Sequence, residues 1–508
     1  MIELIRKLQL PLQTLNLTVG FMVWVIISSL LPFIVEDISI PTNQLALVTA
    51  LPVILGSVLR IPVGYYANRL GARTIFLISF IALLFPVYYI SIATTYMDLL
   101  IGGLFLGIGG AVFSVGVTSL PKYYSKERHG FINGVYGAGN LGTALSAFGA
   151  PFIAEKIGWT STIHLYLVIL GVFILLNFFL GDKKEEKVNE PLLKQIKAVY
   201  KNEKLWLLSL FYFITFGSFV AFTIYLPNFL VDNFGLDKVD AGFRTAGFIV
   251  LATAMRTVGG WLGDRFNPHI LLMFVFGGYT ASAILLSFAP DITWYSIGCL
   301  TIAFCAGTGN GVIFKLVPMY FQAQAGIANG IVSAMGGLGG FFPPIMLTVL
   351  YSVTGHYAIG FMALSQAALA SLILVIWMYY KDKIGFSEQV IKNTIEGIMI
   401  TNKNGKIISV NPAFTEITGY QEREVIGGNP SILKSDKQDE EFFRNLWELI
   451  QENGFWQGEI WNRRKDGEVY LGWLTISGIK NDAGDTIRYA GMFSDISQSS
   501  LKLKAKQP

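Results

Sequence analysis

Charged residues are scarce in this chain. Asp, Glu, Lys and Arg make up 14% of its 508 residues, against 53% hydrophobic residues. Because about a quarter of the residues in soluble domains are charged, this composition excludes an ordinary soluble protein, and the mean hydropathy of +0.53 indicates a membrane protein. The net charge of +4 is too small to indicate a nucleic-acid-binding protein.

Cysteine is rarer still. The two cysteines, Cys299 and Cys305, lie in one apolar run, which excludes a disulfide framework and a cysteine metal cluster. A small-residue cleavage site is also lacking after the first apolar run, residues 12–35. We therefore expect this run to be a spanning helix and not a removed signal peptide.

Apolar runs, in contrast, are plentiful. Runs of about 20 residues, enough to cross a hydrocarbon core of about 30 Å, are predicted at twelve places: 12–35, 45–67, 74–93, 98–121, 130–154, 162–180, 206–231, 240–263, 269–289, 293–315, 326–350 and 357–380. Lys and Arg gather in alternate loops, above all in residues 181–204, which predicts that both termini are cytoplasmic. The sequence thus predicts a multi-pass protein of the cytoplasmic membrane.

A repeat divides this membrane body. Four positions of its first part recur 196 residues later, namely Arg60, Gly64, Asn68 and Arg69 as Arg256, Gly260, Asp264 and Arg265. Asn133-Gly134 recurs at the same offset as Asn329-Gly330. The repeat predicts two homologous six-helix halves, residues 1–180 and 205–383, joined by a cytoplasmic connection at 181–204.

Each half carries one arginine, Arg60 or Arg256, deep inside an apolar helix. Each lies about nine residues, or roughly 13 Å of helix rise, from the arginine that ends its helix, so neither side chain is expected to reach the membrane surface. A buried arginine is costly unless it faces a cavity or a partner, and the predicted spans hold no Asp or Glu away from their ends. We expect two unpaired guanidinium groups that bind a small planar oxyanion between the halves.

Aromatic and small residues are expected to complete this site. Tyr212 and Phe216 lie one helical turn apart, and Phe113 follows a glycine-rich run. A phenol can donate a hydrogen bond to an anion and phenyl rings can form walls, although contact with lipid or a neighbouring helix is the alternative for each ring. Two stripes of small residues, 134–142 and 330–340, favour close helix packing and supply the other expected contacts: Gly137, Asn140, Ser333 and Gly336.

Polar residues at the cytoplasmic helix ends are expected to latch neighbouring helices in one conformation. They are Asn68, Arg69 and Arg73 in the first half, and Asp264 and Arg265 in the second. Charge pairs and helix ends would provide the latch. Charge that merely sets the topology is the alternative.

These features resemble the major facilitator superfamily and, within it, the nitrate/nitrite porter family. The loop Gly64-x4-Arg69-x-Gly71-x-Arg73 is similar to the superfamily's loop between helices 2 and 3, although Asn68 stands where an acidic residue is usual. Arg60 and Arg256 match arginines of the porters, and residues 134–144 and 330–344 resemble their nitrate signatures. The resemblance covers residues 1 to about 385. It implies a twelve-helix fold, alternating access, no cofactor for transport, and nitrate or nitrite as substrate.

The C-terminal segment differs in composition. Residues 387–508 hold 15 Lys/Arg and 17 Asp/Glu, against 23 and 17 in the three times longer segment 1–386. Alternating patterns and turns predict strands near 398–401, 407–411, 455–464, 468–480 and 487–496, with helices near 412–418 and 439–452. We therefore expect a cytoplasmic α+β domain at 388–498, followed by a basic tail at 499–508.

Residues 388–498 resemble a PAS sensor domain, on Trp456-x-Gly458-Glu459 and the segment 462–470. All four histidines lie outside it and it has no cysteine, so a His-ligated haem and a flavin–thiol adduct are not expected. The stretch 429–435 is similar to flavin-binding redox PAS domains. Bound flavin is thus one interpretation, beside a PAS domain that is empty, docks a cytoplasmic protein or forms a dimer.

The sequence therefore predicts not an enzyme but a nitrate/nitrite transporter with a regulatory PAS domain. A receptor that senses nitrate and signals through PAS, and a porter for another small oxyanion, are the alternatives. Because no carboxylate or histidine stands out at mid-membrane, nitrate/nitrite exchange is slightly favoured over proton symport, and both modes stay open.

Overall fold

The computed structural model describes residues 2–40, 45–288, 290–354, 358–481 and 484–497. Contacts divide the chain into two compact units, residues 1–379 and 380–508. The basic tail predicted at 499–508 lies outside the described residues.

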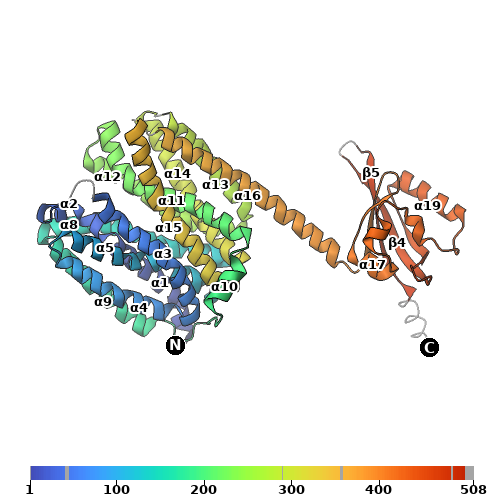
Figure 1. The fold of residues 1–508 in the computed structure, drawn as a ribbon, viewed down its shortest axis with the longest axis horizontal. Coiled ribbons are helices and arrows are strands. Elements are labelled where there is room, and N and C mark those ends of the chain that lie inside the picture. Colours follow the sequence, from blue (N-terminus) through green and yellow to red (C-terminus); the bar gives the residue numbers. More distant parts are fainter. Residues whose placement is uncertain (1, 41–44, 289, 355–357, 482–483, 498–508) are drawn as a thin grey trace. The chain divides into compact units, whose positions relative to one another are not determined.

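Unit 1–379 is built from helices (Figure 1). The first half contains α1 (Ile2–Trp24), α2 (Ile26–Asp37), α3 (Leu45–Leu70), α4 (Ala72–Ser91), α5 (Tyr96–Ala111), α6 (Phe113–Ser119), α7 (His129–Gly137), α8 (Leu141–Ile157) and α9 (Trp159–Leu180). The connection holds α10 (Leu192–Val199). The second half contains α11 (Glu203–Phe234), α12 (Lys238–Arg265), α13 (Pro268–Ser287), α14 (Ile292–Tyr320), α15 (Ala325–Thr354) and α16 (Ala358–Asn393).

Ten helical segments among the described residues are long and apolar enough to span a membrane. Of the two other predicted spans, one comprises α7 and α8, which the 3₁₀ turn η4 (Ala138–Asn140) interrupts. The other is α15, whose described apolar part is Ala325–Phe341. The predicted helical membrane body is therefore confirmed.

Three features of these helices differ from the predicted spans. The first span begins at Ile2 and is interrupted at Val25, and the fourth is interrupted at Val112 between α5 and α6. A hydropathy window passes over such breaks because the residues on both sides are apolar. α16 continues to Asn393, since hydropathy marks the membrane and not the helix end, and the Glu388–Lys392 pair (2.6 Å) supports its polar turns.

Paired glycines bring the two halves together in equivalent ways. α3 packs against α15, and α12 packs against α7. A Cβ atom on Gly64 would lie 2.4 Å from the carbonyl oxygen of Gly326, and one on Gly260 would lie 2.0 Å from that of Gly130. Since no larger residue fits such contacts, the repeated glycines fix two matching crossings between the halves. We call this end of the unit, which carries Arg69 and Arg265, the basic end.

The C-terminal unit contains one antiparallel sheet of order β2-β1-β5-β4-β3. Its strands are β1 (Gly397–Asn402), β2 (Ile407–Val410), β3 (Phe455–Arg463), β4 (Val469–Lys480) and β5 (Thr486–Asp495), and its helices are α17 (Pro412–Thr418), α18 (Glu422–Val425) and α19 (Glu440–Asn453). Phe414, Leu433, Ile460 and Phe493 belong to its separate core. The predicted α+β domain is confirmed.

Candidate functional site: an arginine pair between the two halves

The two arginines of the repeat meet in the interior of unit 1–379. Arg60 lies on α3 and Arg256 on α12, and the residues are 0% and 1% exposed. Both lie over the same two rings: Cζ of Arg60 is 5.3 Å from the centre of Phe113 and 5.4 Å from that of Phe216, and Cζ of Arg256 is 4.9 Å and 6.0 Å from them. Each half thus supplies one arginine and one phenylalanine. Together with Tyr212, these four residues are called the arginine site.

Backbone carbonyl groups of both halves hold Arg60. Its Nε donates to the carbonyl oxygen of Gly110 at 3.2 Å, and its Nη1 donates to that of Ser333 at 2.7 Å. The Ser333 bond joins the halves, as does the 2.9 Å contact between the hydroxyl groups of Ser333 and Ser114. Carbonyl groups fix the guanidinium in place but leave its charge uncompensated.

Arg256, in contrast, has no recorded hydrogen-bond partner among the residues that the structure describes. Its Nε, Nη1 and Nη2 are all buried, and none of them finds an acceptor. α7 comes so close that a Cβ atom on Gly137 would lie 2.0 Å from Nε. Because a buried charge without a partner is strongly destabilising, this arrangement favours the entry of an anion beside Arg256.

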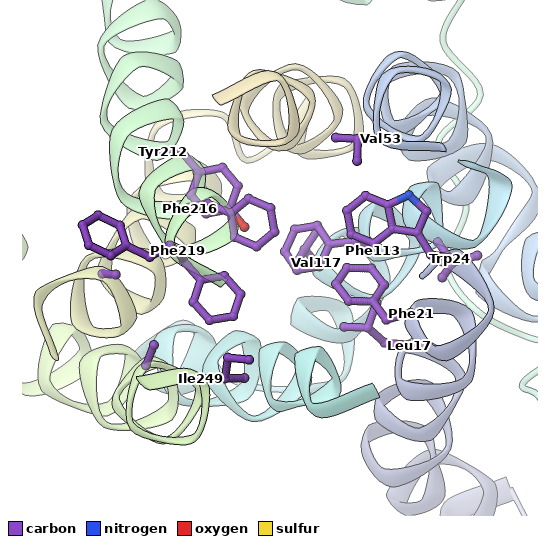
Figure 2. Packing of buried hydrophobic residues seen from close by; sticks show 14 of the residues in the cluster. Leu17, Phe21, Trp24, Val53, Phe113, Val117, Tyr212, Phe216, Phe219 and Ile249 are labelled. Carbon is purple, nitrogen blue, oxygen red and sulfur yellow. The ribbon is translucent and has the colours of Figure 1, made fainter. Parts of the chain in front are cut away.

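Aromatic rings enclose the Arg256 side of the site. The ring centres of Tyr212 and Phe314 lie 5.8 Å and 5.7 Å from Cζ of Arg256. Figure 2 shows Tyr212 and Phe216, both on α11, facing Phe113 across the interior. The Tyr212 hydroxyl is buried and has no recorded hydrogen-bond partner within the described part of the chain. It therefore adds a further donor to those of Arg256 in surroundings with little water.

Of the small residues selected from the sequence, Gly137, Gly336 and Ser333 contact these groups, and Asn140 has no recorded side-chain contact with them. A Cβ atom on Gly336 would lie 2.2 Å from the Tyr212 ring, so α15 reaches the site only because this residue is glycine. Asn140 lies on η4, three residues beyond Gly137, and is 2% exposed with its Oδ1 unpartnered. Ser333 contributes its carbonyl group to Arg60, as described above.

Sequence reasoning did not select two residues around the site, Phe314 and Ser114, or the buried Asn310 on the same helix as Phe314. Phe314 packs edge-on against Tyr212, with ring centres 4.9 Å apart. Ser114 bonds Ser333, and Asn310 on α14 is buried with its Oδ1 unpartnered. Asn310 had a signal, because it interrupts the repeated glycine run that ends in Gly110 in the first half. Phe314 and Ser114 had none that separates them from other apolar or small helix residues.

At the basic end, Asp264 joins the two halves. Its carboxylate accepts hydrogen bonds from the backbone N–H groups of Gly130 (2.9 Å) and Phe131 (2.7 Å) at the start of α7, and pairs with Lys315 at 2.7 Å. A carboxylate is favourable at a helix N-terminus. Nearby, burial lowers the pKa of His129, so its ring is neutral at pH 7 and adds no positive charge beside Lys315.

The three other expected latch arginines make contacts inside their own halves, whereas Asn68 contacts the connection between the halves. Arg69 donates to the Tyr65 hydroxyl at 2.9 Å, Arg73 donates to the carbonyl oxygen of Phe178 at 3.0 Å, and Arg265 lies over the Trp261 ring at 4.4 Å. The carbonyl oxygen of Asn68 accepts from the Val188 N–H at 3.0 Å. Asp264 differs from these residues because its carboxylate accepts hydrogen bonds from the other half, from the N–H groups of Gly130 and Phe131, while its charge pair with Lys315 stays within the second half.

The C-terminal unit encloses a cavity of about 320 Å³ between its sheet and helices. Apolar side chains such as Leu433, Phe443 and Phe493 line most of it, and Asn429 and Asn462 add amide groups. This volume is at the lower limit for small-molecule sites, roughly 300 to 1,000 Å³. The lining fits a flat aromatic ring system with a polar edge, so the ring of a flavin is compatible with it.

The sequence of residues 14–344 matches the model of the Major Facilitator Superfamily, and residues 395–498 match that of a PAS domain. The chain belongs to the major facilitator superfamily. Proteins of this superfamily are transporters and not enzymes. The PAS match begins just after the end of α16 at Asn393.

Relatives of this major facilitator protein are close over the membrane body. A Bacillus subtilis protein named "Nitrite extrusion protein" is 63% identical over 378 residues, which are 74% of this chain and 96% of the relative. Proteins named "Probable nitrate transporter NarT" from Staphylococcus epidermidis and Staphylococcus haemolyticus are 54% and 52% identical, over 74% of this chain and 97% of each relative. The resemblance to nitrate/nitrite porters is confirmed, and the PAS domain lies beyond the shared region.

Proposed function

We propose that this protein transports nitrate, nitrite or both by alternating access, with the anion bound at the arginine site. The single observation that carries the proposal is the buried guanidinium of Arg256, which has three unpartnered nitrogen atoms and faces a second arginine across shared phenylalanine rings. The names of the relatives identify nitrate and nitrite as the anions to test first.

The chemistry of the site suits a small planar oxyanion. The donor fork of Arg256 matches two oxygen atoms of such an anion, and the Tyr212 hydroxyl can donate to one more. Phe113 and Phe216 lie beside both arginines, where flat rings complement a flat guest. A bound anion would also reduce the repulsion between Arg60 and Arg256, so closing around a loaded site is easier than closing around an empty one.

The topology is part of the proposal. Lys and Arg concentrate in the loops at the basic end and in the connection 181–204, which supports a cytoplasmic location for that end and for both termini. The paired glycine contacts at the basic end then correspond to a body closed toward the cytoplasm. The cytoplasmic membrane is the location that this orientation implies.

Exchange of nitrate for nitrite is the transport mode that we favour. Among the described residues, the groups within contact of the two guanidinium groups are carbonyl, hydroxyl and aromatic groups, and none of these takes up a proton near pH 7. Counterflow in proteoliposomes tests both substrate and mode. We expect internal nitrite to drive nitrate uptake. Uptake driven by a pH gradient without internal nitrite would contradict exchange. Competition by formate, chlorate or sulfate would show that the protein transports a different oxyanion.

We propose a regulatory role for the PAS domain, either through a ligand in its cavity or through a partner protein or second copy. Nitrate uptake by cells that express residues 1–386 separates this role from that of a receptor. Continued nitrate uptake by the truncated chain supports a regulated transporter. If the truncated chain takes up no nitrate and the full-length chain only changes its binding to a partner, the receptor is supported. The absorbance spectrum of the purified full chain tests for flavin.

A further inference from the structure

The repeat leaves one half without a carboxylate at the basic end. Asn68 and Asp264 occupy equivalent positions of the repeat. Each side chain lies against the first residues of a helix of the opposite half, α15 for Asn68 and α7 for Asp264. A Cβ atom on Gly130 would lie 2.9 Å from the Asp264 carboxylate, and one on Gly326 would lie 2.9 Å from Cβ of Asn68. The start of α7 thus faces a negative charge, whereas the start of α15 faces a neutral amide.

The connection between the halves brings a different carboxylate, that of Glu185, to the basic end of the first half. Glu185 accepts a hydrogen bond from the Ala72 N–H, the first residue of α4, at 2.7 Å, and pairs with Lys122 at 3.0 Å. Its side chain is only 1% exposed and that of Lys122 is 16% exposed. A buried carboxylate that faces a helix N-terminus and a lysine repeats the chemistry of Asp264 with Lys315.

The residues that follow Glu185 also form hydrogen bonds with the first half, at the ends of several of its helices. The Val188 N–H donates to the carbonyl oxygen of Asn68 at 3.0 Å, and the Tyr65 hydroxyl donates to that of Glu190 at 3.2 Å. Lys122 also donates to the carbonyl oxygen of Glu186 at 2.8 Å. The following helix, α10, packs against α15 of the second half. Residues 182–190, called the strap, therefore run from the first half to a helix that contacts the second.

We propose that Glu185 is a positioning residue of the transport cycle, which supplies the carboxylate that Asn68 lacks. The strap then serves as the first half's latch and keeps the basic end closed, as Asp264 does for the second half. Opening of the basic end separates α15 from α3 and pulls on α10, which packs against α15, while the bonds of Glu185 to Ala72 and Lys122 hold the strap on the first half and oppose this movement. This inference rests on the alternating access proposed above.

A cysteine reporter at Thr118 measures opening of the basic end. Thr118 is 3% exposed, and its Oγ1 lies 3.5 Å from Nδ2 of Asn329 on α15. In the purified full chain with T118C, C299S and C305S, a maleimide reaches this thiol only when α15 moves away. Labelling rates are measured in detergent without nitrate, so the readout does not depend on transport or on the identity of the anion.

We expect E185Q to raise the labelling rate roughly tenfold, because a mostly buried Lys122 loses its charged partner. The matched control is E186Q, which removes the same charge from an exposed neighbour whose recorded contact with Lys122 is through its backbone, and it should keep the parent rate. D264N, at the equivalent latch, should label at least as fast as E185Q. N68D added to E185Q should return the rate to the parent value, since it places a carboxylate at the start of α15.

Two results would overturn the proposal. One is a maleimide labelling rate for E185Q that equals that of the parent, regardless of the rate found for D264N. The other is a labelling rate that E185Q raises and that the added N68D does not lower, because Glu185 would then serve only local folding. A chain that carries no nitrate would still give the expected labelling pattern, so failure of the transport proposal is distinguishable from failure of this one.

Discussion

Arg60 and Arg256 occupy equivalent positions in the two halves, yet their surroundings differ. Arg60 bonds the carbonyl oxygens of Gly110 and Ser333, whereas all three guanidinium nitrogens of Arg256 are unpartnered. Arg60 is therefore held in place without an anion, and Arg256 is not. Within the proposed binding site we therefore expect different roles: Arg60 joins the halves and contributes charge, and Arg256 is the main donor to the anion.

The helices opposite each arginine explain this difference. Gly110 lies just before the interruption at Val112, where α5 ends and α6 begins. At such a break, carbonyl groups of the preceding turn lose regular helix partners and become available to Arg60. The equivalent helix of the second half, α14, runs unbroken from Ile292 to Tyr320. No break of this kind presents a carbonyl group to Arg256, and among the described residues none of its nitrogen atoms has a recorded acceptor.

The largest expected effect is that of R256A on nitrate uptake in proteoliposomes. Charge-assisted hydrogen bonds contribute roughly 1.5 to 3 kcal/mol each, so the loss of two such bonds reduces anion affinity by at least roughly a hundredfold. We expect no measurable uptake. Uptake within a few fold of the parent would show that the unpartnered guanidinium is not the anion site.

The next largest effect is that of G137A. Its new methyl group would lie 2.0 Å from Nε of Arg256, and overpacking of this kind costs roughly 1 to 3 kcal/mol, so we expect uptake to fall about tenfold. G149A in α8 is the control, because a Cβ atom there meets nothing within 4 Å. Equal uptake rates for G137A and G149A would contradict the close approach of α7 to Arg256.

Y212F should weaken nitrate binding without weakening the fold. The Tyr212 hydroxyl has no recorded hydrogen-bond partner among the described residues, so we expect its removal to leave no new unsatisfied group and to remove only a hydrogen bond to the anion. We expect roughly tenfold higher nitrate concentrations for half-maximal uptake. Y279F, which removes a hydroxyl that donates to the carbonyl oxygen of Thr215 at 3.3 Å, should leave this value unchanged, and a parent value for Y212F would exclude the phenol from the site.

The smallest effect is expected from S114A, on the Arg60 side. The variant removes one hydroxyl contact between the halves, of about 1 kcal/mol, while both carbonyl bonds to Arg60 stay in place. We expect uptake within about threefold of the parent, measured beside G137A. A loss as large as that of G137A would show that Arg60 is not held independently.

The sequence alone predicted much of the fold and the positions of the site residues. The offset of 196 residues placed Arg60 opposite Arg256, and the hydropathy pattern predicted the helices on which they lie. The glycine stripes predicted close packing, and Gly137 and Gly336 indeed lie against Arg256 and Tyr212. Alternation and turn residues predicted the strands of the PAS domain.

The partners of these residues could not be predicted, because they depend on details that composition does not record. The interruption at Val112, which frees a carbonyl group for Arg60, lies in a run that is apolar on both sides. The contact of Glu185 with Lys122 joins residues 63 positions apart through a polar connection without periodicity. A repeat therefore predicts where residues lie, and the local backbone decides what they bind.

The most direct test of the central claim is a nitrate titration of purified R60K and R256K, followed by thermal unfolding. Lysine keeps the charge in both variants but lacks the donor fork. We predict that nitrate raises the unfolding temperature of the parent and, at higher concentrations, that of R60K, but not that of R256K. Stabilisation of R256K at the parent's nitrate concentrations would contradict the assignment of Arg256 as the main anion donor.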